Sequence, residues 1–293
     1  MSRSPYPSTV TLPPGAQPYP TIADFLAATF PVVSREAWRQ RISEGKVLDD
    51  REQAITLQTP YRPGLRLTYF REVAAEPRIP FEAPVLFRDD HLLVADKPHF
   101  LPVTPGGRFV NECLLHRLRA ETGIAELMPL HRIDRETAGL VLFSVNPGSR
   151  SAYHRLFRED RVEKQYRALA RCPEPPEVRE WRVENRLEKG RPAIQMRVAD
   201  GDTNARSAIR LLEIRDGIGC FSLLPLTGKT HQLRVHMSGL GFPILNDRHY
   251  PVLLPRVPDD FENPLQLLAC ALRFSDPLSG DIHYFESARC LKV

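Results

Sequence analysis

The sequence predicts a mixed α+β fold, in which a small N-terminal α+β module is followed by a larger domain. Segments typical of strands outnumber segments typical of amphipathic helices, and few regular helices separate them. Between the two parts lies 77–84, which is rich in proline and is typical of a linker. A chain of 293 residues is long enough for one or two domains and for a sizeable core.

The N-terminal part is expected to contain an irregular arm and two short helices. Residues 1–20 hold six prolines, which favours an irregular arm. Thr21 precedes an apolar stripe of helical period, and Ser34 is a suitable cap for a second helix that ends at Gly45. Together with the short strands that follow, these helices form a module over 21–76.

The larger domain, 85–293, is expected to be rich in strands. Helices are predicted over 111–122, 148–160 and 230–240. Strands are predicted over 85–87, 91–95, 140–143, 162–170, 205–214, 219–226, 265–274 and 281–285, with shorter fragments at 183–185 and 194–198.

Composition and cysteine usage indicate a cytoplasmic protein. Hydrophobic residues make up 42% of the chain and charged residues 26%, which is ordinary for a globular protein. No apolar run approaches the ~18 residues that a membrane span needs, and no signal peptide is indicated. The five cysteines form no Cys-x-x-Cys pair, so neither a zinc site nor a disulfide framework is predicted.

Positive charge is concentrated in one part of the chain. The net charge is +4, and residues 131–171 hold nine basic and five acidic side chains, an excess as large as that of the whole chain. A local basic zone of this kind suits a phosphate backbone. A solvated helix face would explain the same cluster.

The chemically most distinctive segment is His131 to Leu140, which reads His-Arg-Ile-Asp-Arg-Glu-Thr-Ala-Gly-Leu. It leads directly into a predicted buried strand, which places Asp134 close to the sheet. Arg132 and Arg135 flank Asp134, and nearby positive charge keeps a carboxylate ionised. The pattern fits a catalytic carboxylate, and equally a structural ion pair at the end of a loop.

This segment resembles the signature of the pseudouridine synthases of the RluA type, His-Arg-Leu-Asp-Arg-x-Thr-Ser-Gly-Leu. Ile133 and Ala138 are mild departures. Upstream, Asp96 to Val103 resembles the first motif of the family, with Phe100 where glycine is common. The resemblance therefore begins before the charged loop.

Two further motifs follow in the order found in the family. The strand over 162–170 resembles the Lys-x-Tyr-x-Ala motif, with Lys164 and Tyr166 in place. Residues 226–237 resemble Thr-Gly-Arg-x-His-Gln-Leu-Arg-Val-His, with a lysine in place of the first arginine, and a following segment has Asn246 where glycine is usual. The resemblance covers about 85–290.

The resemblance implies a catalytic domain around a central, largely antiparallel sheet, and an isomerase that converts uridine to pseudouridine in RNA. The target nucleotide must be flipped out of its stack into a pocket. The resemblance implies that Asp134 is the catalytic carboxylate, that Arg234 is its positive partner and that Tyr166 stacks on the base. No cofactor and no metal are implied, in agreement with the absence of zinc spacing and of a dinucleotide-binding glycine motif.

The partner is expected to be RNA, either ribosomal or transfer RNA. Ribosomal RNA is favoured because the 21–76 module resembles a small RNA-binding module shared with a ribosomal protein. No membrane association and no obligate protein partner are expected, and the chain is expected to be monomeric. Basic and imidazole side chains around the motifs are predicted to contact RNA: Arg132, His131, Arg135, Lys164, Lys229 and His231.

Other functions fit parts of the sequence. A kinase catalytic loop shares the His-Arg-x-Asp order, but the chain has no Gly-x-Gly-x-x-Gly loop and no Asp-Phe-Gly triplet. A metal hydrolase would use His131, Asp134, His231 and His236. A catalytically inactive RNA-binding protein on the same fold is a further alternative.

Overall fold

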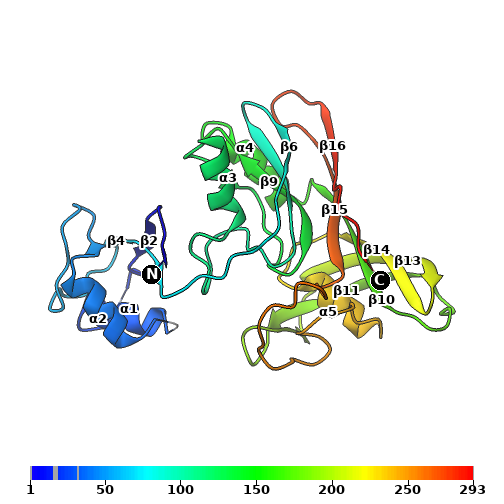
Figure 1. The fold of residues 1–293 in the computed structure, drawn as a ribbon, viewed down its shortest axis with the longest axis horizontal. Coiled ribbons are helices and arrows are strands. Elements are labelled where there is room, and N and C mark those ends of the chain that lie inside the picture. Colours follow the sequence, from blue (N-terminus) through cyan, green and yellow to red (C-terminus); the bar gives the residue numbers. More distant parts are fainter. Residues whose placement is uncertain (1, 16–18, 32, 293) are drawn as a thin grey trace. The chain divides into compact units, whose positions relative to one another are not determined.

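The computed structural model describes residues 2–15, 19–31 and 33–292, and its contacts divide the chain into two compact units (Figure 1). The first unit contains 1–78 and 105–112, and the second contains 79–104 and 113–293. Residues 105–112 fall within the region that the sequence assigns to the larger domain. Their backbone is held in the first unit by Glu76, whose carboxylate accepts N–H groups of Asn111 at 2.8 Å and of Glu112 at 2.7 Å.

The first unit contains two capped helices and short strands. Helix α1 (Ile22–Thr29) begins at Thr21, whose side chain accepts the Asp24 N–H, and α2 (Arg35–Ser43) begins at Ser34, which accepts the Ala37 N–H. These caps confirm both predicted helix starts. The strands are β1 (Ser2–Arg3), β2 (Ser8–Thr11), β3 (Val47–Leu48), β4 (Arg66–Tyr69) and β5 (Glu72–Val73).

The prediction of an irregular arm over 1–20 is wrong for part of that segment. Strand β2 pairs with β4 in a three-stranded sheet of order β2-β4-β3, and β1 pairs with β5. Residues 8–11 alternate in burial and include Val10 and two threonines, which suit a strand. The prolines lie outside these four residues, so they limit the length of the strand without preventing it.

The second unit is built on one large sheet of order β12-β11-β13-β14-β10-β15-β9-β7-β6, with β16 paired to β15 and β8 paired to β9 (Figure 1). The only parallel pair among these described strands is β9 with β15. The predicted mixed α+β fold with a largely antiparallel sheet is confirmed. The bounds are β6 (Val85–Arg88), β7 (Leu92–Lys97), β8 (Met128–Pro129), β9 (Ala138–Ser144), β10 (Glu163–Arg171), β11 (Glu180–Lys189), β12 (Met196–Ala199), β13 (Ala205–Arg215), β14 (Ile218–Pro225), β15 (Leu267–Ser275) and β16 (Ile282–Glu286).

Three helices belong to this unit: α3 (Leu114–Thr122), α4 (Arg150–Arg158) and α5 (Gln232–Gly239). Helix α4 packs Tyr153 and Leu156 in one core cluster with Val162, just before β10. Helix α5 packs Leu233 and Met237 in another cluster with Ala168 of β10. Because alternate residues of a strand share a face, α4 and α5 cover the same face of β10. The side chains of β10 between these two clusters are those of Lys164 and Tyr166.

Gly139 sets how closely the two parallel strands approach each other. It lies opposite Ala269 of β15, has a φ of +115°, and a Cβ at this position would lie 2.2 Å from the Ala269 carbonyl oxygen. No side chain fits between two backbones at that distance. The glycine therefore fixes the start of β9, and with it the preceding charged loop, against β15.

We expect Gly139→Ala to lower the free energy of unfolding by about 2–5 kcal/mol, because it combines backbone strain with a steric clash. The measurement is urea unfolding of the purified protein. Gly239→Ala is the matched control, because a Cβ there would meet nothing within 4 Å. The control is expected to change the same free energy by less than about 1 kcal/mol. Equal effects of the two substitutions would contradict this account.

Candidate active site

The charged loop of 130–137 connects β8 to β9, and a buried lysine is hydrogen-bonded to its backbone. Lys97, at the end of β7, is 0% exposed, and its Nζ donates to the carbonyl oxygens of Pro98 at 2.9 Å, Leu101 at 2.8 Å and Arg135 at 3.1 Å. The His99 ring contacts the Glu136 carbonyl oxygen at 2.6 Å. The loop backbone therefore has fixed partners at the two residues that directly follow Asp134.

Arg234 is the positive group nearest to Asp134. Arg234 lies in α5, is 1% exposed, and its Nη1 donates to Asp134 Oδ2 at 3.4 Å. Asp134 is 25% exposed, so one side of its carboxylate is open to an incoming molecule. The predicted pairing of Asp134 with Arg234 is thus present in the structure.

Asp247 is the functional residue that the sequence analysis missed. Its buried carboxylate binds Arg234 through two bonds, Nε to Oδ2 at 2.8 Å and Nη2 to Oδ1 at 2.6 Å. Two-pronged pairing of this kind fixes the plane of the guanidinium. The remaining nitrogen of Arg234, Nη1, is therefore free to face Asp134. The one signal in the sequence is that Asp247 directly follows Asn246, in the segment after 226–237 that also resembles the family.

Backbone turns carry Asp247 to this position. The Leu245 N–H donates to the Leu169 carbonyl of β10 at 2.8 Å, which lays the segment beside the central sheet. Asn246 then adopts a φ of +63°, and Phe100 in the first motif adopts +66°. These are the two positions at which the family commonly has glycine, which reaches positive φ without strain. The fold keeps the left-handed turns here with other residues.

His231 approaches the same carboxylate oxygen of Asp134 as Arg234 does. Its Nε2 is 3.9 Å from Asp134 Oδ2, and its Nδ1 is 3.0 Å from the Tyr250 hydroxyl. The Tyr250 oxygen accepts the Met196 N–H at 2.6 Å. Burial lowers the pKa of His231, although Asp134 opposes this effect. His231 has a φ of +53° and precedes α5, so the helix begins at Gln232 and not at Thr230 as the sequence predicts.

Tyr166 is an aromatic residue close enough to Asp134 for the charge of that carboxylate to affect its hydroxyl. It lies in β10 opposite Leu223 of β14 and Ala269 of β15. Burial, followed by the charge of Asp134, raises the pKa of the Tyr166 hydroxyl, so it stays neutral. Asp134, Arg234 and Tyr166 are therefore brought together, as the sequence predicts. A carboxylate, its cation and a flat neutral ring are the parts needed to hold and react with a base.

The residues predicted to contact RNA divide into two groups. The side chains of Arg132 and Lys229 are exposed, and Lys164 is half-buried on the Tyr166 face of β10. His131 and Arg135 are instead engaged in internal contacts. The His131 ring stacks on Phe157, with centroids 4.7 Å apart, and its Nε2 accepts the Leu142 N–H at 3.1 Å.

Arg135 forms a two-pronged ion pair with Asp259, at 2.9 Å for each bond, and also contacts Glu136 at 2.8 Å. Its guanidinium carbon lies 5.9 Å from the centroid of the Phe100 ring. These contacts tie the charged loop to the segment that precedes β15. Arg135 therefore holds the charged loop in place, a role that its position next to Asp134 in the sequence does not reveal.

The metal-hydrolase alternative is not favoured by these contacts. Burial lowers the pKa of His131 to about 3, and its ring nitrogen is taken by a backbone N–H. His236 contacts Ser207 Oγ at 3.0 Å and Asn185 Oδ1 at 3.1 Å, so both of its nitrogens are bonded. Within 2–15, 19–31 and 33–292 no group of three or more His, Cys, Asp or Glu side chains is placed to hold a metal ion.

Lys97 gives the fold a specific pH dependence. Burial lowers the pKa of Lys97 to about 7, although the charges of Glu136 and Asp134 oppose the effect. Above pH 7 the folded state therefore binds fewer protons at this residue than the unfolded state, whose lysine titrates near about 10.4. Stability rises with pH wherever the unfolded state binds more protons. The contribution of Lys97 to the free energy of unfolding therefore becomes more favourable as the pH rises above 7.

We expect the unfolding free energy of the wild type, minus that of Lys97→Met, to rise between pH 7 and pH 9. The slope approaches about 1.4 kcal/mol per pH unit, and it vanishes well below pH 7, where lysine is protonated in both states. Urea unfolding at several pH values measures the difference, in which the titration of all other groups cancels. A difference independent of pH would show that Lys97 keeps its ordinary pKa.

Taken together, the fold and the site place a partly open carboxylate beside a buried guanidinium, with an aromatic side chain nearby. The sequence matches the RNA pseudouridylate synthase family over residues 91–239, about half of the chain. An uncharacterized RNA pseudouridine synthase of Synechocystis sp. is 32% identical over 228 residues, which are 78% of this chain and 78% of the relative. The chain belongs to the RNA pseudouridylate synthase family and is an isomerase that acts on RNA.

Other relatives differ in the RNA for which they are named. Ribosomal large subunit pseudouridine synthase C of Salmonella typhi is 29% identical over 250 residues, covering 79% of this chain and 77% of the relative. The mitochondrial tRNA pseudouridine(32) synthase of Saccharomyces cerevisiae is 27% identical over 236 residues, covering 78% and 50%. The solved structure of human RNA pseudouridylate synthase domain containing 1 has the same fold, with a TM-score of 0.59, 23% identity and coverage of 73% and 86%.

No described helix is both long enough and apolar enough to cross a membrane.

Proposed function

We propose that this enzyme isomerises uridines of ribosomal RNA, with Asp134 as the catalytic carboxylate. The observation that carries the proposal is the position of Asp134, which is partly open to solvent and lies 3.4 Å from a buried guanidinium. The guanidinium orients the carboxylate, and the open side admits a nucleotide. Tyr166 supplies the surface on which the flipped base stacks, which contributes about 1–3 kcal/mol of binding.

The reaction breaks the bond between ribose and N1 of uracil and forms one between ribose and C5. The hydrogen on C5 leaves as a proton in the last step and N1 takes up a proton, so the product is an isomer of the substrate and no electrons are gained or lost. In this proposal Arg234 stabilises the charge of Asp134 before the reaction, and Asp247 holds Arg234 in the required plane. A fixed charge of this kind costs no reorganisation when the bond breaks.

The preference for ribosomal RNA is supported by two observations. One relative of similar coverage is named for the large ribosomal subunit. The first unit, with its two capped helices and small sheet, is proposed to be an additional RNA-binding module. We also propose that the enzyme works as a monomer in the cytoplasm, which agrees with the absence of disulfides among the five described cysteines.

Release of tritium from RNA carrying 5-tritiated uridine tests the proposal, because forming pseudouridine expels the hydrogen at C5. Ribosomal and transfer RNA are purified separately from cells that lack the gene, so their target sites are unmodified. We expect release from ribosomal RNA only. Release from transfer RNA only would overturn the substrate class and keep the reaction. Release from neither fraction, when both bind the protein, would favour a catalytically inactive RNA-binding protein.

A further inference from the structure

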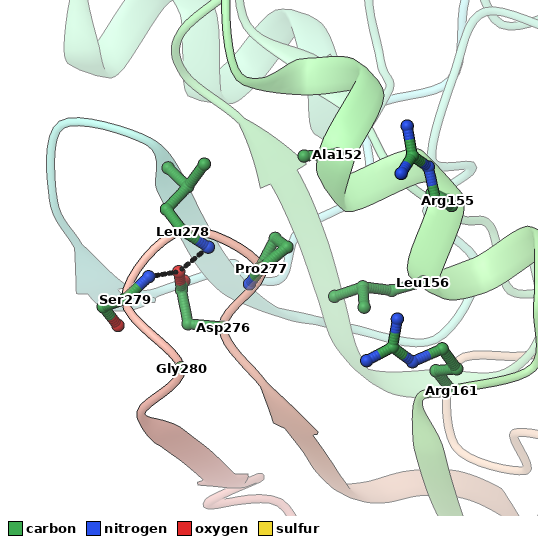
Figure 2. Close-up of a pocket in the computed structure, with 9 residues that line it drawn as sticks. All are labelled: Ala152, Arg155, Leu156, Arg161, Asp276, Pro277, Leu278, Ser279 and Gly280. Carbon is green, nitrogen blue, oxygen red and sulfur yellow. Dashed lines mark hydrogen bonds between the residues drawn. The ribbon is translucent and has the colours of Figure 1, made fainter.

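A cavity lies at one edge of the large sheet, and Asp134 is not among the residues that line it. Helix α4 and the turn between β15 and β16 enclose a volume of about 460 Å³ (Figure 2). Arg155 comes from α4, and Arg161 follows that helix; both line the cavity, and Leu278 and Ser279 line it from the turn. The cavity thus has two guanidinium groups on one wall and a tight turn on the other.

The charge of this cavity is positive. Arg155 has no ion-pair partner among the described residues, and Arg161 has only an exposed contact with Glu159 at 3.8 Å. One carboxylate, Asp276, also lines the cavity. Its carboxylate oxygens already have hydrogen-bond partners within the protein, which leaves the two arginines available for another anion.

Asp276 is held by four groups. The Tyr153 hydroxyl donates to Oδ2 at 2.7 Å, and His283 Nε2 lies 3.4 Å from the same oxygen. The backbone N–H groups of Leu278 and Ser279 donate to Oδ1 at 2.8 and 3.0 Å, as Figure 2 shows. The carboxylate therefore shapes the turn of the cavity wall and is not free to pair with the arginines.

The cavity is connected to the active site by strand β10. Arg161 precedes this strand, and Lys164 and Tyr166 lie further along it on the face covered by α4 and α5. Five strand residues span about 17 Å, at about 3.3 Å for each residue. Lys164 lies between the cavity and Tyr166. A polyanion that starts at Tyr166 can therefore reach Lys164 and then Arg161 along this strand.

The cavity is also fixed relative to the catalytic loop. His131, at the beginning of the loop, stacks on Phe157 of α4 with an interplanar angle of 19°. From 148 to 158 the chain has three arginines and no acidic residue. The His131–Phe157 stacking therefore packs the loop that carries Asp134 against the helix that carries Arg155.

We propose that this cavity binds a backbone phosphate of the RNA substrate, on the strand that leads away from the flipped uridine. The inference rests on the proposed function, because it assumes an RNA chain anchored at Tyr166. Guanidinium groups bind phosphate oxygens in paired geometry, which suits two arginines facing one cavity. The contact positions the RNA and carries no sequence information of its own.

The test compares Arg155→Ala and Arg161→Ala with Arg158→Ala. Arg158 belongs to the same helix and is 76% exposed, but it does not line the cavity. The dissociation constant of a labelled oligouridine is measured at several salt concentrations, and kcat and KM are measured on ribosomal RNA. The two cavity arginines are exposed, so thermal melting is expected to show no loss of folding for any of the three variants.

We expect each cavity variant to weaken binding and raise KM by about tenfold, with kcat unchanged. The slope of log K against log salt is expected to decrease by about 0.7 for each arginine removed. The Arg158 variant is expected to match the wild type. Equal effects of all three substitutions, or unchanged binding in both cavity variants, would overturn the proposal. If the wild type binds with the predicted pattern but turns over no RNA, the proposed function fails and the phosphate site stands.

Discussion

Asp134→Asn is expected to lower kcat/KM for pseudouridine formation by at least about 10⁴-fold, because a catalytic group held in place is equivalent to a very high local concentration. The substitution keeps the shape of the side chain and removes its charge. Arg234 retains its two bonds to Asp247, so unfolding free energy is expected to change by less than about 1 kcal/mol. Single-turnover tritium release measures the rate, and filter binding shows whether RNA affinity is retained.

Glu136→Gln is the matched control for this prediction. Glu136 lies in the same loop, is as exposed as Asp134, and has a carboxylate oxygen 4.0 Å from Arg234 Nη1. Burial opposes its ionisation, but Arg135 and Arg234 outweigh burial and lower the pKa of Glu136. The loop thus contains two carboxylates near one guanidinium. We expect only a few-fold loss of rate for Glu136→Gln, and the reverse order of effects would reassign the catalytic carboxylate.

Arg234→Ala is expected to lower the free energy of unfolding by about 3–5 kcal/mol as well as abolishing activity. The variant leaves the Asp247 carboxylate, which is 0% exposed, without its positive partner, and breaking a buried pair from one side costs about that much. Arg234→Lys keeps the charge but loses the planar fork, so it is expected to retain more stability than activity. Urea unfolding and tritium release together measure both effects.

A double variant separates the structural and the catalytic contributions of this pair. Arg234→Met with Asp247→Leu replaces both charges by apolar groups of similar size. Because replacing a whole buried pair is often neutral, the double variant is expected to regain most of the stability lost in Arg234→Ala. Activity is expected to stay absent, because Nη1 no longer faces Asp134. Recovery of activity in the double variant would show that Asp134 needs no positive partner.

The parts of the site that follow from local patterns could be predicted from the sequence. The strand that carries Tyr166 has a clear alternation, and the apolar stripe of α5 places Leu233 and Met237 in the core. The pairing of Arg234 with a carboxylate could therefore be anticipated. The sequence did not reveal that the fully buried partner is Asp247, whereas Asp134 is partly open.

Contacts that depend on loop conformation could not be predicted. The pairing of Arg135 with Asp259 joins residues 124 positions apart, and the bonds from Lys97 go to backbone oxygens, which no sequence pattern marks. His131 was predicted to contact RNA because it begins the charged loop. Its stacking on Phe157 depends on how α4 packs against the sheet. Position in the charged loop was thus a poor guide to which side chains are engaged in internal contacts.

The central claim is that this chain makes pseudouridine in RNA through Asp134. The most direct test is a map of pseudouridine in RNA from cells that lack the gene, complemented either with the wild type or with Asp134→Asn at equal protein levels. We predict at least one ribosomal RNA site that is lost on deletion, restored by the wild type and not restored by the variant. Restoration by Asp134→Asn, or a map unchanged by deletion, would contradict the account.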